Sequence, residues 1–225
     1  MTTQGKLKNQ SRKYRVLLVD DHPLVRRGLA DVIAREPDLE TCGEAADVLE
    51  AMHEVEQTSP DVVVVDLMLK TGHGIELVEK LKSCNPRVKI LVSSMHDETL
   101  FAERVLRAGA MGYVSKREPP EALVQAIRQV LRGELYVSPG MTNHLLQRVG
   151  GGAPAQEDPV QGLSNREIAV YQMIGQGLTI RQIATRLHLS PKTVETHREK
   201  IKQKLNLKSS TELNRHAVQW VLEHG

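Results

Sequence analysis

The stretch Asp61-Val62-Val63-Val64-Val65-Asp66-Leu67 decides the fold of this chain of 225 residues. Four consecutive valines are typical of a short strand that is covered on both faces, as the central strands of a parallel sheet are. Asp66 then stands at the carboxyl end of the strand, where open α/β sheets bind their ligands. Taken alone, the stretch favours a plainer interpretation, in which Asp66 only ends the strand or caps a turn. The neighbouring segments must decide between the two.

Four further strands are expected around this one, each followed by a helix. The five strands are predicted at residues 16–19, 39–45, 62–66, 88–93 and 112–115, and the helices begin near residues 23, 47, 74, 97 and 119. The polar alternation of residues 39–45 suits the edge of a sheet. Strands that alternate with helices in this way predict an α/β domain, a flavodoxin-like, doubly wound, five-stranded parallel sheet.

Polar residues follow four of these strands. Asp20 and Asp21 end the first strand, Asp66 the third, Ser94 the fourth and Lys116 the fifth. Three carboxylates gathered at one edge repel one another and call for a cation, and oxygen ligands with room for water suit Mg²⁺. Asp66 can then act as a nucleophile toward a phosphoryl group. Lys116 would pair with the phosphoryl oxygens, and Ser94 would donate a hydrogen bond to them.

This half of the chain resembles the receiver domains of two-component response regulators. The resemblance implies that a partner histidine kinase phosphorylates Asp66, and that the backbone carbonyl of Met68 joins Asp20, Asp21 and Asp66 around Mg²⁺. It also implies that a switch aromatic turns inward as Ser94 moves toward the phosphate. The residues that carry the resemblance are the pair Asp20-Asp21, Asp66, Ser94, Gly112-Tyr113-Val114 and Lys116.

Two positions depart from the family pattern. The chain has Lys70 where members usually carry proline, and His73 where they often carry an acidic residue. Neither residue is required by the chemistry, but both lie in the loop after Asp66. The lifetime of the phosphorylated state and the choice of kinase therefore do not follow from the resemblance.

A change of composition divides the chain. A helix is expected at residues 141–149, and the segment from Gly150 to Gln161 has no apolar period, as in a flexible tether. We therefore predict a receiver domain at 14–133, a linker with a short helix at 134–162 and a second domain at 163–225. From Leu163 onward, the chain has ten lysines and arginines but only five acidic residues, whereas the whole chain has a net charge of only +2. A basic second half is suited to approach nucleic acid.

The second domain is predicted to be all-α, with four helices at 164–175, 179–187, 191–205 and 210–223. Ser164 with Glu167, Thr179 with Gln182, and Ser209 with Glu212 have the spacing of capping boxes, and Ser190 precedes Pro191 at a first helical turn. Only a short turn separates the second and third helices, as in a helix-turn-helix.

The third of these helices presents groups that suit the major groove of DNA. The segment resembles the LuxR-type output domain of NarL/FixJ response regulators in residues 163–167, 177–179, 182–184 and 192–198. A small helical bundle with a solvated basic face is the plainer alternative. The candidate DNA contacts are Lys192, Thr193, Glu195, Thr196, Arg198, Glu199, Lys200, Lys202 and Gln203.

These observations together predict a cytoplasmic transcription regulator that is controlled by phosphorylation and is not an enzyme. The expected partners are a sensor histidine kinase, double-stranded promoter DNA and a second copy of the chain, because the resemblance implies that the last helix pairs output domains. No membrane segment, disulfide or zinc site is indicated, and both cysteines are expected to be buried. Two alternatives stay open: a Mg²⁺-dependent phosphatase with Asp66 as nucleophile, and a regulator that uses its receiver only as a dimer scaffold.

Overall fold

A computed structural model describes residues 12–69, 71–149 and 159–224 of the chain. Lys70, one of the two departures from the family pattern, and most of the expected tether lie outside these residues. Among the described residues, no helix combines the length and the apolar character needed to cross a bilayer.

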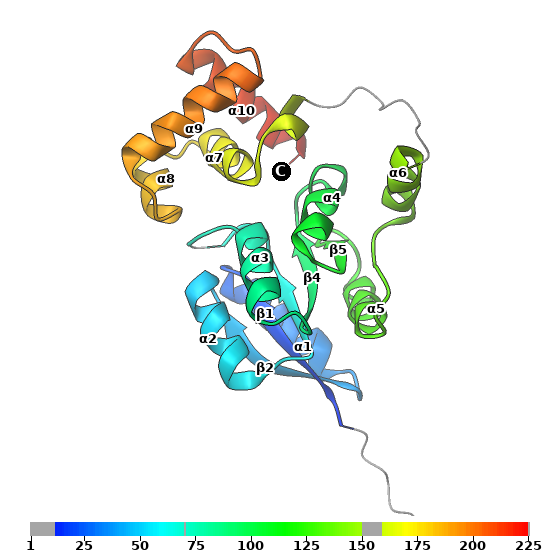
Figure 1. Ribbon diagram of the computed structural model, residues 1–225. Coiled ribbons are helices and arrows are strands. Elements are labelled where there is room, and N and C mark those ends of the chain that lie inside the picture. The colour runs from blue at the N-terminus through cyan, green and yellow to red at the C-terminus, as the bar shows by residue number, and fades with distance from the viewer. Residues whose placement is uncertain (1–11, 70, 150–158, 225) are drawn as a thin grey trace, which may run out of the picture.

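The first part of the chain alternates strands and helices as the sequence predicts (Figure 1). The strands are β1 (Tyr14–Val19), β2 (Leu39–Ala45), β3 (Val62–Val65), β4 (Lys89–Ser94) and β5 (Gly112–Ser115). The helices that follow them are α1 (Pro23–Ala34), α2 (Val48–Thr58), α3 (Gly74–Cys84), α4 (Glu98–Ala108) and α5 (Pro120–Leu131).

The five strands form one parallel sheet in the order β2-β1-β3-β4-β5, with β2 at an edge as expected. The strand order reverses between β1 and β3, and ligands of doubly wound sheets bind in the crevice at that point. Asp20 and Asp66 directly follow these two strands. The valine run of β3 is fully buried because it lies in the middle of the sheet.

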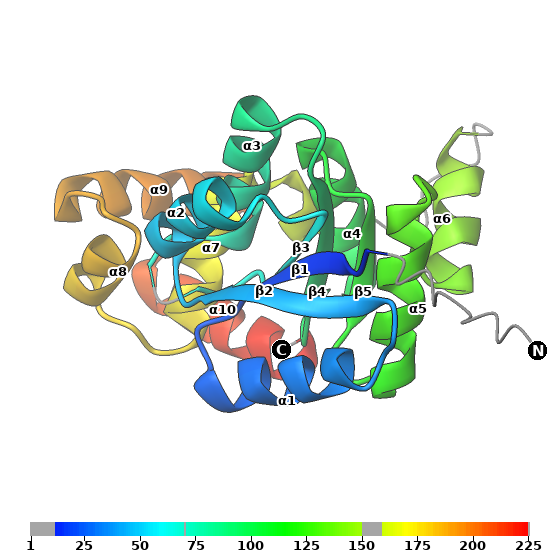
Figure 2. The same cartoon turned by 90° about the horizontal axis from the view of Figure 1, so that it is seen from below.

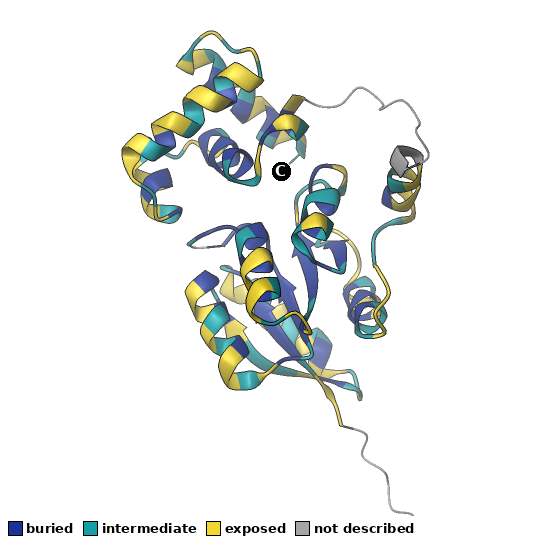
Figure 3. Cartoon of the chain, in the orientation of Figure 1, coloured by how far each residue is buried: buried dark blue, intermediate teal, exposed yellow. Residues whose placement is uncertain are grey.

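Helices cover both faces of the sheet (Figure 2). Successive side chains of a strand point to opposite faces, so each strand contributes to two cores. Val62 and Val64 pack with residues of α1 and α5, whereas Val63 and Val65 pack with residues of α2, α3 and α4. Figure 3 shows the buried sheet between helices whose outer faces are exposed.

The second part of the chain is helical. After α6 (Pro139–Val149) and a short 3-10 helix, η1 (Pro159–Gly162), come α7 (Asn165–Gly175), α8 (Ile180–Arg186), α9 (Pro191–Lys204) and α10 (Ser210–His224). A left-handed residue, His188, makes the tight turn between α8 and α9, which confirms the predicted helix-turn-helix.

The helix caps explain why these helices begin where they do. Complete capping boxes form at Ser164 and at Thr179, and the Ser190 hydroxyl accepts the backbone N–H of Thr193. The third predicted box is only half formed. Ser209 accepts the N–H of Glu212, but the carboxylate of Glu212 accepts the N–H of Lys208 rather than that of Ser209.

The prediction for the cysteines was wrong. Cys84 is exposed at the end of α3, and Cys42 is only half-buried on the edge strand β2. Their small size made burial the expectation, but one lies on a solvated helix end and the other on a sheet edge.

Candidate functional site

The carboxyl ends of β1, β3 and β5 bring three side chains into direct contact. Nζ of Lys116 lies 2.5 Å from Oδ2 of Asp20 and 2.8 Å from Oδ2 of Asp66. Both carboxylates are almost fully buried, with exposed fractions of 2% and 6%. The lysine therefore bridges two acids that would otherwise repel each other in a poorly solvated site.

Burial and the ion pairs act in opposite directions on the pKa values of this cluster. Burial raises the pKa of Asp66, and the nearby ammonium group of Lys116 offsets only part of this effect. Burial alone would lower the pKa of Lys116, but Asp66 and Asp20 together raise it. Lys116 is thus held in its charged form.

The acid cluster has the composition of a divalent-cation site. Ligand atoms of Asp20, Asp21, His22 and Asp66 lie within 4.8 Å of one another. The Oδ1 atom of Asp21 is buried and accepts no hydrogen bond, although Nδ1 of His22 lies 2.7 Å away. Because no group of the described residues donates to this oxygen with hydrogen-bond geometry, its lone pairs are available to a cation. The donor set consists mainly of carboxylate oxygens, which suits Mg²⁺.

Ser94 and Tyr113 lie beside this cluster. Ser94 is fully buried, and its hydroxyl accepts a long hydrogen bond of 3.4 Å from the backbone N–H of His96. The Tyr113 ring is also buried, and its hydroxyl donates to the carbonyl of His96 at 2.7 Å. The ring therefore already points inward in this structure. Its expected movement on phosphorylation stays a prediction.

The loop after Asp66 is tightly packed. Gly74 begins α3 so close to this loop that an added Cβ would lie 2.2 Å from the carbonyl oxygen of Asp66. Met68 forms an isolated bridge with His73 and lines the pocket beside Asp66. His73 is buried and caps α3, because its Nδ1 accepts the N–H of Ile75. The imidazole thus provides a cap acceptor at this position.

The phosphoacceptor candidate opens into a pocket of about 530 Å³. Asp66, Ser94 and Lys116 line it together with His22 and Met95, and so does Gln176 from the end of α7. The helical domain therefore contributes to the surroundings of the receiver site. The sequence patterns did not predict this contact.

Arg186, the last residue of α8, makes the most direct contact between the helical domain and the acid cluster. Its Nη2 lies 3.2 Å from Oδ2 of Asp21, and its Nε donates to the carbonyl of Leu69. The N–H of Gly72 donates to the backbone carbonyl of Arg186 at 2.9 Å. Arg186 therefore holds both an acid of the cluster and the loop that follows Asp66.

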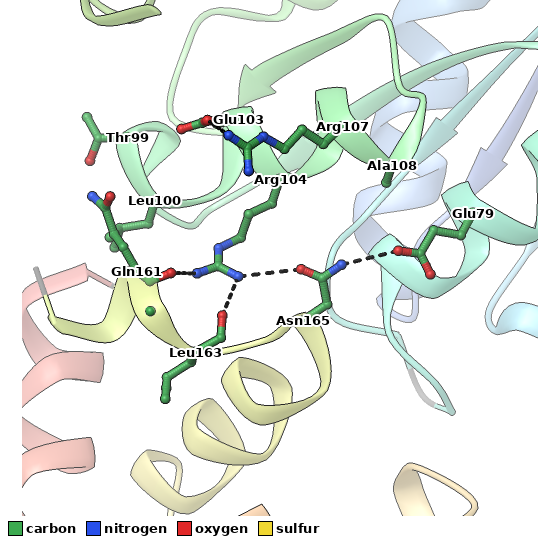
Figure 4. A pocket seen from close by; sticks show the side chains of 11 residues that line it. Glu79, Thr99, Leu100, Glu103, Arg104, Arg107, Ala108, Gln161, Leu163 and Asn165 are labelled. Carbon is green, nitrogen blue, oxygen red and sulfur yellow. Dashed lines mark hydrogen bonds and ion pairs between the residues drawn. The ribbon is translucent and has the colours of Figure 1, made fainter. Parts of the chain in front are cut away.

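A second contact joins α4 to the start of the helical domain (Figure 4). The guanidinium of Arg104 donates to the carbonyls of Gln161 and Leu163, each at 2.7 Å, and points toward the side chain of Asn165. Asn165 in turn donates to Glu79 of α3. A third link is the 2.9 Å ion pair between Arg166 of α7 and Glu76 of α3. These contacts and those of Arg186 form the interdomain contact.

The candidate DNA contacts lie together on α9, away from the acid cluster. Val194 and Ile201 anchor this helix in the core, which leaves the opposite face open to solvent. Thr193, Arg198 and Lys202 are half-buried, and Lys202 pairs with Glu199 at 2.9 Å. The exposed candidates are Lys192, Glu195, Thr196, Glu199, Lys200 and Gln203. The interdomain contact therefore leaves this face uncovered.

Comparison with known proteins matches both halves of the chain to families. Residues 16–128 match the response regulator receiver domain, and residues 161–217 match the bacterial regulatory proteins of the luxR family. The oxygen regulatory protein NreC of Staphylococcus carnosus is 38% identical over 209 residues, which cover 91% of this chain and 96% of that protein.

Solved structures agree with these matches. A two-component response regulator of the LuxR family from Aurantimonas sp. SI85-9A1 is 38% identical, with a TM-score of 0.58, and covers 61% of this chain and 99% of its own. RcsB from Salmonella enterica, solved on promoter DNA with a phosphomimetic, has a TM-score of 0.68 over 92% of this chain and 98% of its own. At 24% identity, RcsB supports the fold alone.

The matches cover nearly the whole length of both this chain and the NreC protein. They confirm the predicted pairing of a receiver with a helix-turn-helix output domain, and they set aside the phosphatase alternative, because such proteins are regulators rather than enzymes. The chain therefore belongs to the NarL/FixJ family of two-component response regulators, in which a receiver domain controls a LuxR-type DNA-binding domain that regulates transcription.

Proposed function

We propose that Asp66 accepts a phosphoryl group from a sensor histidine kinase and that this modification controls promoter binding by α9. The observation that carries the proposal is the juxtaposition of Asp66, Asp20 and Lys116 at the switch point of the sheet. Asp66 is the acid of this group that directly follows the central strand. Its carboxylate faces the 530 Å³ pocket through which a phosphodonor can approach.

In the proposed reaction, an Asp66 carboxylate oxygen forms a bond to phosphorus while the bond from phosphorus to the kinase histidine nitrogen breaks. Lys116 keeps its charge and pairs with the phosphoryl oxygens, and the Ser94 hydroxyl donates to one of them. Asp20, Asp21, Asp66 and the Met68 carbonyl would hold Mg²⁺. When bound, the ion supplies positive charge that screens the incoming phosphoryl oxygens from the carboxylates.

The output step is proposed to act through α4 and the interdomain contact. Ser94 ends β4, and Tyr113 is hydrogen-bonded to the backbone of the segment that leads from β4 into α4. Movement of Ser94 toward a phosphoryl group would shift that segment and, with it, Arg104. Because Arg104 holds the carbonyls of residues 161 and 163, the shift would weaken the interdomain contact.

For DNA binding, we propose that α9 enters the major groove with its exposed face. Lys192 and Lys200 would contact phosphates, and Thr196, Glu199 and Gln203 would face base edges. Two output domains would pair over a two-fold site. Such a regulator would work in the cytoplasm, where promoter DNA lies.

The test is to incubate the full chain with acetyl phosphate and Mg²⁺ and to locate the adduct by mass spectrometry. We expect one phosphoryl group, on Asp66, and none in the Asp66→Asn variant or after chelation of the metal. An adduct on another residue, or none, would contradict the proposed site. A stable adduct that leaves DNA affinity unchanged would instead favour the scaffold alternative.

A further inference from the structure

Arg186 occupies a position in this structure that neither the family matches nor the helix-turn-helix pattern explains. It belongs to α8, the helix before the proposed DNA-reading helix, yet its guanidinium lies 3.2 Å from Oδ2 of Asp21. The Asp21 side chain is 13% exposed and that of Arg186 is 29% exposed, so water screens this ion pair only in part.

The cations around the cluster are divided between the two domains. Lys116 of the receiver contacts Asp20 and Asp66, whereas Asp21 receives its cation, Arg186, from the output domain. Counting only Asp, Lys and Arg side chains, the cluster has three carboxylates and two cations when the domains are in contact, which leaves one negative charge. With the output domain removed, the same carboxylates face only Lys116, which leaves two.

Arg186 also fixes the loop that follows Asp66. Its backbone carbonyl accepts the N–H of Gly72, and its Nε donates to the carbonyl of Leu69. These bonds bracket the segment directly after Met68, whose carbonyl is a proposed metal ligand. Arg186 therefore contacts Asp21 with its guanidinium and also holds the loop after Asp66 in place.

We infer that Arg186 competes with Mg²⁺ at the receiver site, so that contact with the output domain and metal binding oppose each other. The inference rests on the proposed function, because it assumes that Asp20, Asp21 and Asp66 hold the ion. A guanidinium against Asp21 reduces the negative charge that attracts a divalent cation. Coupling between two binding events is reciprocal, so Mg²⁺ weakens the interdomain contact by the same factor.

The inference gives the output domain a role in phosphorylation as well as in DNA binding. A receiver in contact with its output domain binds the ion weakly and is therefore a poor phosphoacceptor. Pairing of two output domains over a two-fold promoter site would move each of them away from its receiver, remove Arg186 from Asp21 and raise the affinity for Mg²⁺. DNA occupancy would thereby favour phosphorylation of the same chain.

Calorimetric titration of the full chain with Mg²⁺ tests this directly. We expect Arg186→Gln to bind Mg²⁺ about tenfold more tightly than the wild type, within the usual range of coupling between sites. Arg181→Gln is the matched control, since Arg181 is an exposed arginine of the same helix. It removes the same charge at a distance and should stay within about twofold of the wild type.

A second variant leaves Arg186 in place. Arg104→Gln loses the bonds to residues 161 and 163 and should also tighten Mg²⁺ binding, because a weaker interdomain contact frees Asp21. In the wild type, Mg²⁺ should accelerate hydrogen exchange at the Gly72 amide, which bonds to Arg186.

Three outcomes would overturn the inference. Equal affinity of the wild type and Arg186→Gln would show that the guanidinium does not compete. Equal tightening by Arg186→Gln and Arg181→Gln would show a general charge effect. If neither the wild type nor Arg186→Gln bound Mg²⁺, the proposed metal site itself would fail, and the inference with it.

Discussion

Replacing Lys116 by methionine tests the electrostatics of the receiver site most sharply. The substitution keeps much of the side-chain volume but removes the only cation that contacts both Asp20 and Asp66 among the described residues. Two nearly buried carboxylates are then left facing each other. Removing one partner of a buried ion pair costs about 3–5 kcal/mol, because the remaining charge stays uncompensated.

We expect Lys116→Met to lower the free energy of unfolding by about 3 kcal/mol at neutral pH without Mg²⁺, the lower end of that range, because Asp66 lines the pocket and water in it can reach the carboxylate. With a denaturant slope of about 1.5 kcal/mol per molar urea, the unfolding midpoint falls by about 2 M. Urea unfolding followed by circular dichroism measures this shift.

Lys80→Met is the matched control. Lys80 pairs with Glu76 at 3.1 Å on the surface of α3, where the two side chains are 48% and 36% exposed. A solvated pair of this kind contributes only about 0.5 kcal/mol or less. Equal losses in the two variants would refute the argument that burial makes the Lys116 pairs strong.

Two conditions are expected to reduce the defect of Lys116→Met. Burial raises the pKa of Asp66, so a falling pH protonates this carboxyl and removes the repulsion. Mg²⁺ supplies a different cation to the same carboxylates. A loss of stability that is unchanged at pH 5 and in Mg²⁺ would mean that the defect is one of packing.

Three further outcomes follow from the structure. Burial lowers the pKa of His73 and of His96 to about 4, so both are neutral in the folded protein at neutral pH. As the pH falls below about 6.5, these histidines become protonated in the unfolded chain before they do in the folded protein. The folded protein therefore loses stability between about pH 6.5 and pH 4. In urea titrations, His73→Gln should lose less stability between pH 7 and pH 5.5 than the wild type does. An unchanged dependence of stability on pH would show that protonation of His73 does not cause the loss. Gly74→Ala should lower the free energy of unfolding by about 2 kcal/mol, because the added Cβ would lie 2.2 Å from a backbone oxygen. Gly28→Ala is the control: its Cβ would meet no atom within 4 Å, so in the same urea titration it should stabilise α1. Lys200→Ala should weaken binding to all DNA sequences similarly and reduce the salt dependence of binding by about one unit, and a sequence-specific loss would point to base contact instead.

The receiver site could be predicted from the sequence because the geometry of a parallel sheet determines it. Once Val62 to Val65 are assigned to a central strand, Asp66 lies at the same edge as Asp20 and Lys116, whatever the loops do. The positions of the output helices were predictable for a similar reason, since caps such as Ser164 and Thr179 act within one helical turn.

The interdomain contact could not be predicted in this way. It depends on how two folded units lie against each other across a linker, and no periodicity or cap encodes that arrangement. Arg104 and Arg186 look like ordinary helix-surface arginines in the sequence, and only the structure brings them to backbone carbonyls and to Asp21. The inward position of Tyr113 likewise depends on the path of the segment after β4.

The affinity of the full chain for a promoter fragment, measured before and after treatment with acetyl phosphate and Mg²⁺, tests the central claim most directly. The proposed mechanism predicts a gain of about 5- to 150-fold for the wild type, the usual size of coupling between two sites, and no gain for Asp66→Asn. An equal gain in both proteins, or none in the phosphorylated wild type, would contradict control of DNA binding through Asp66.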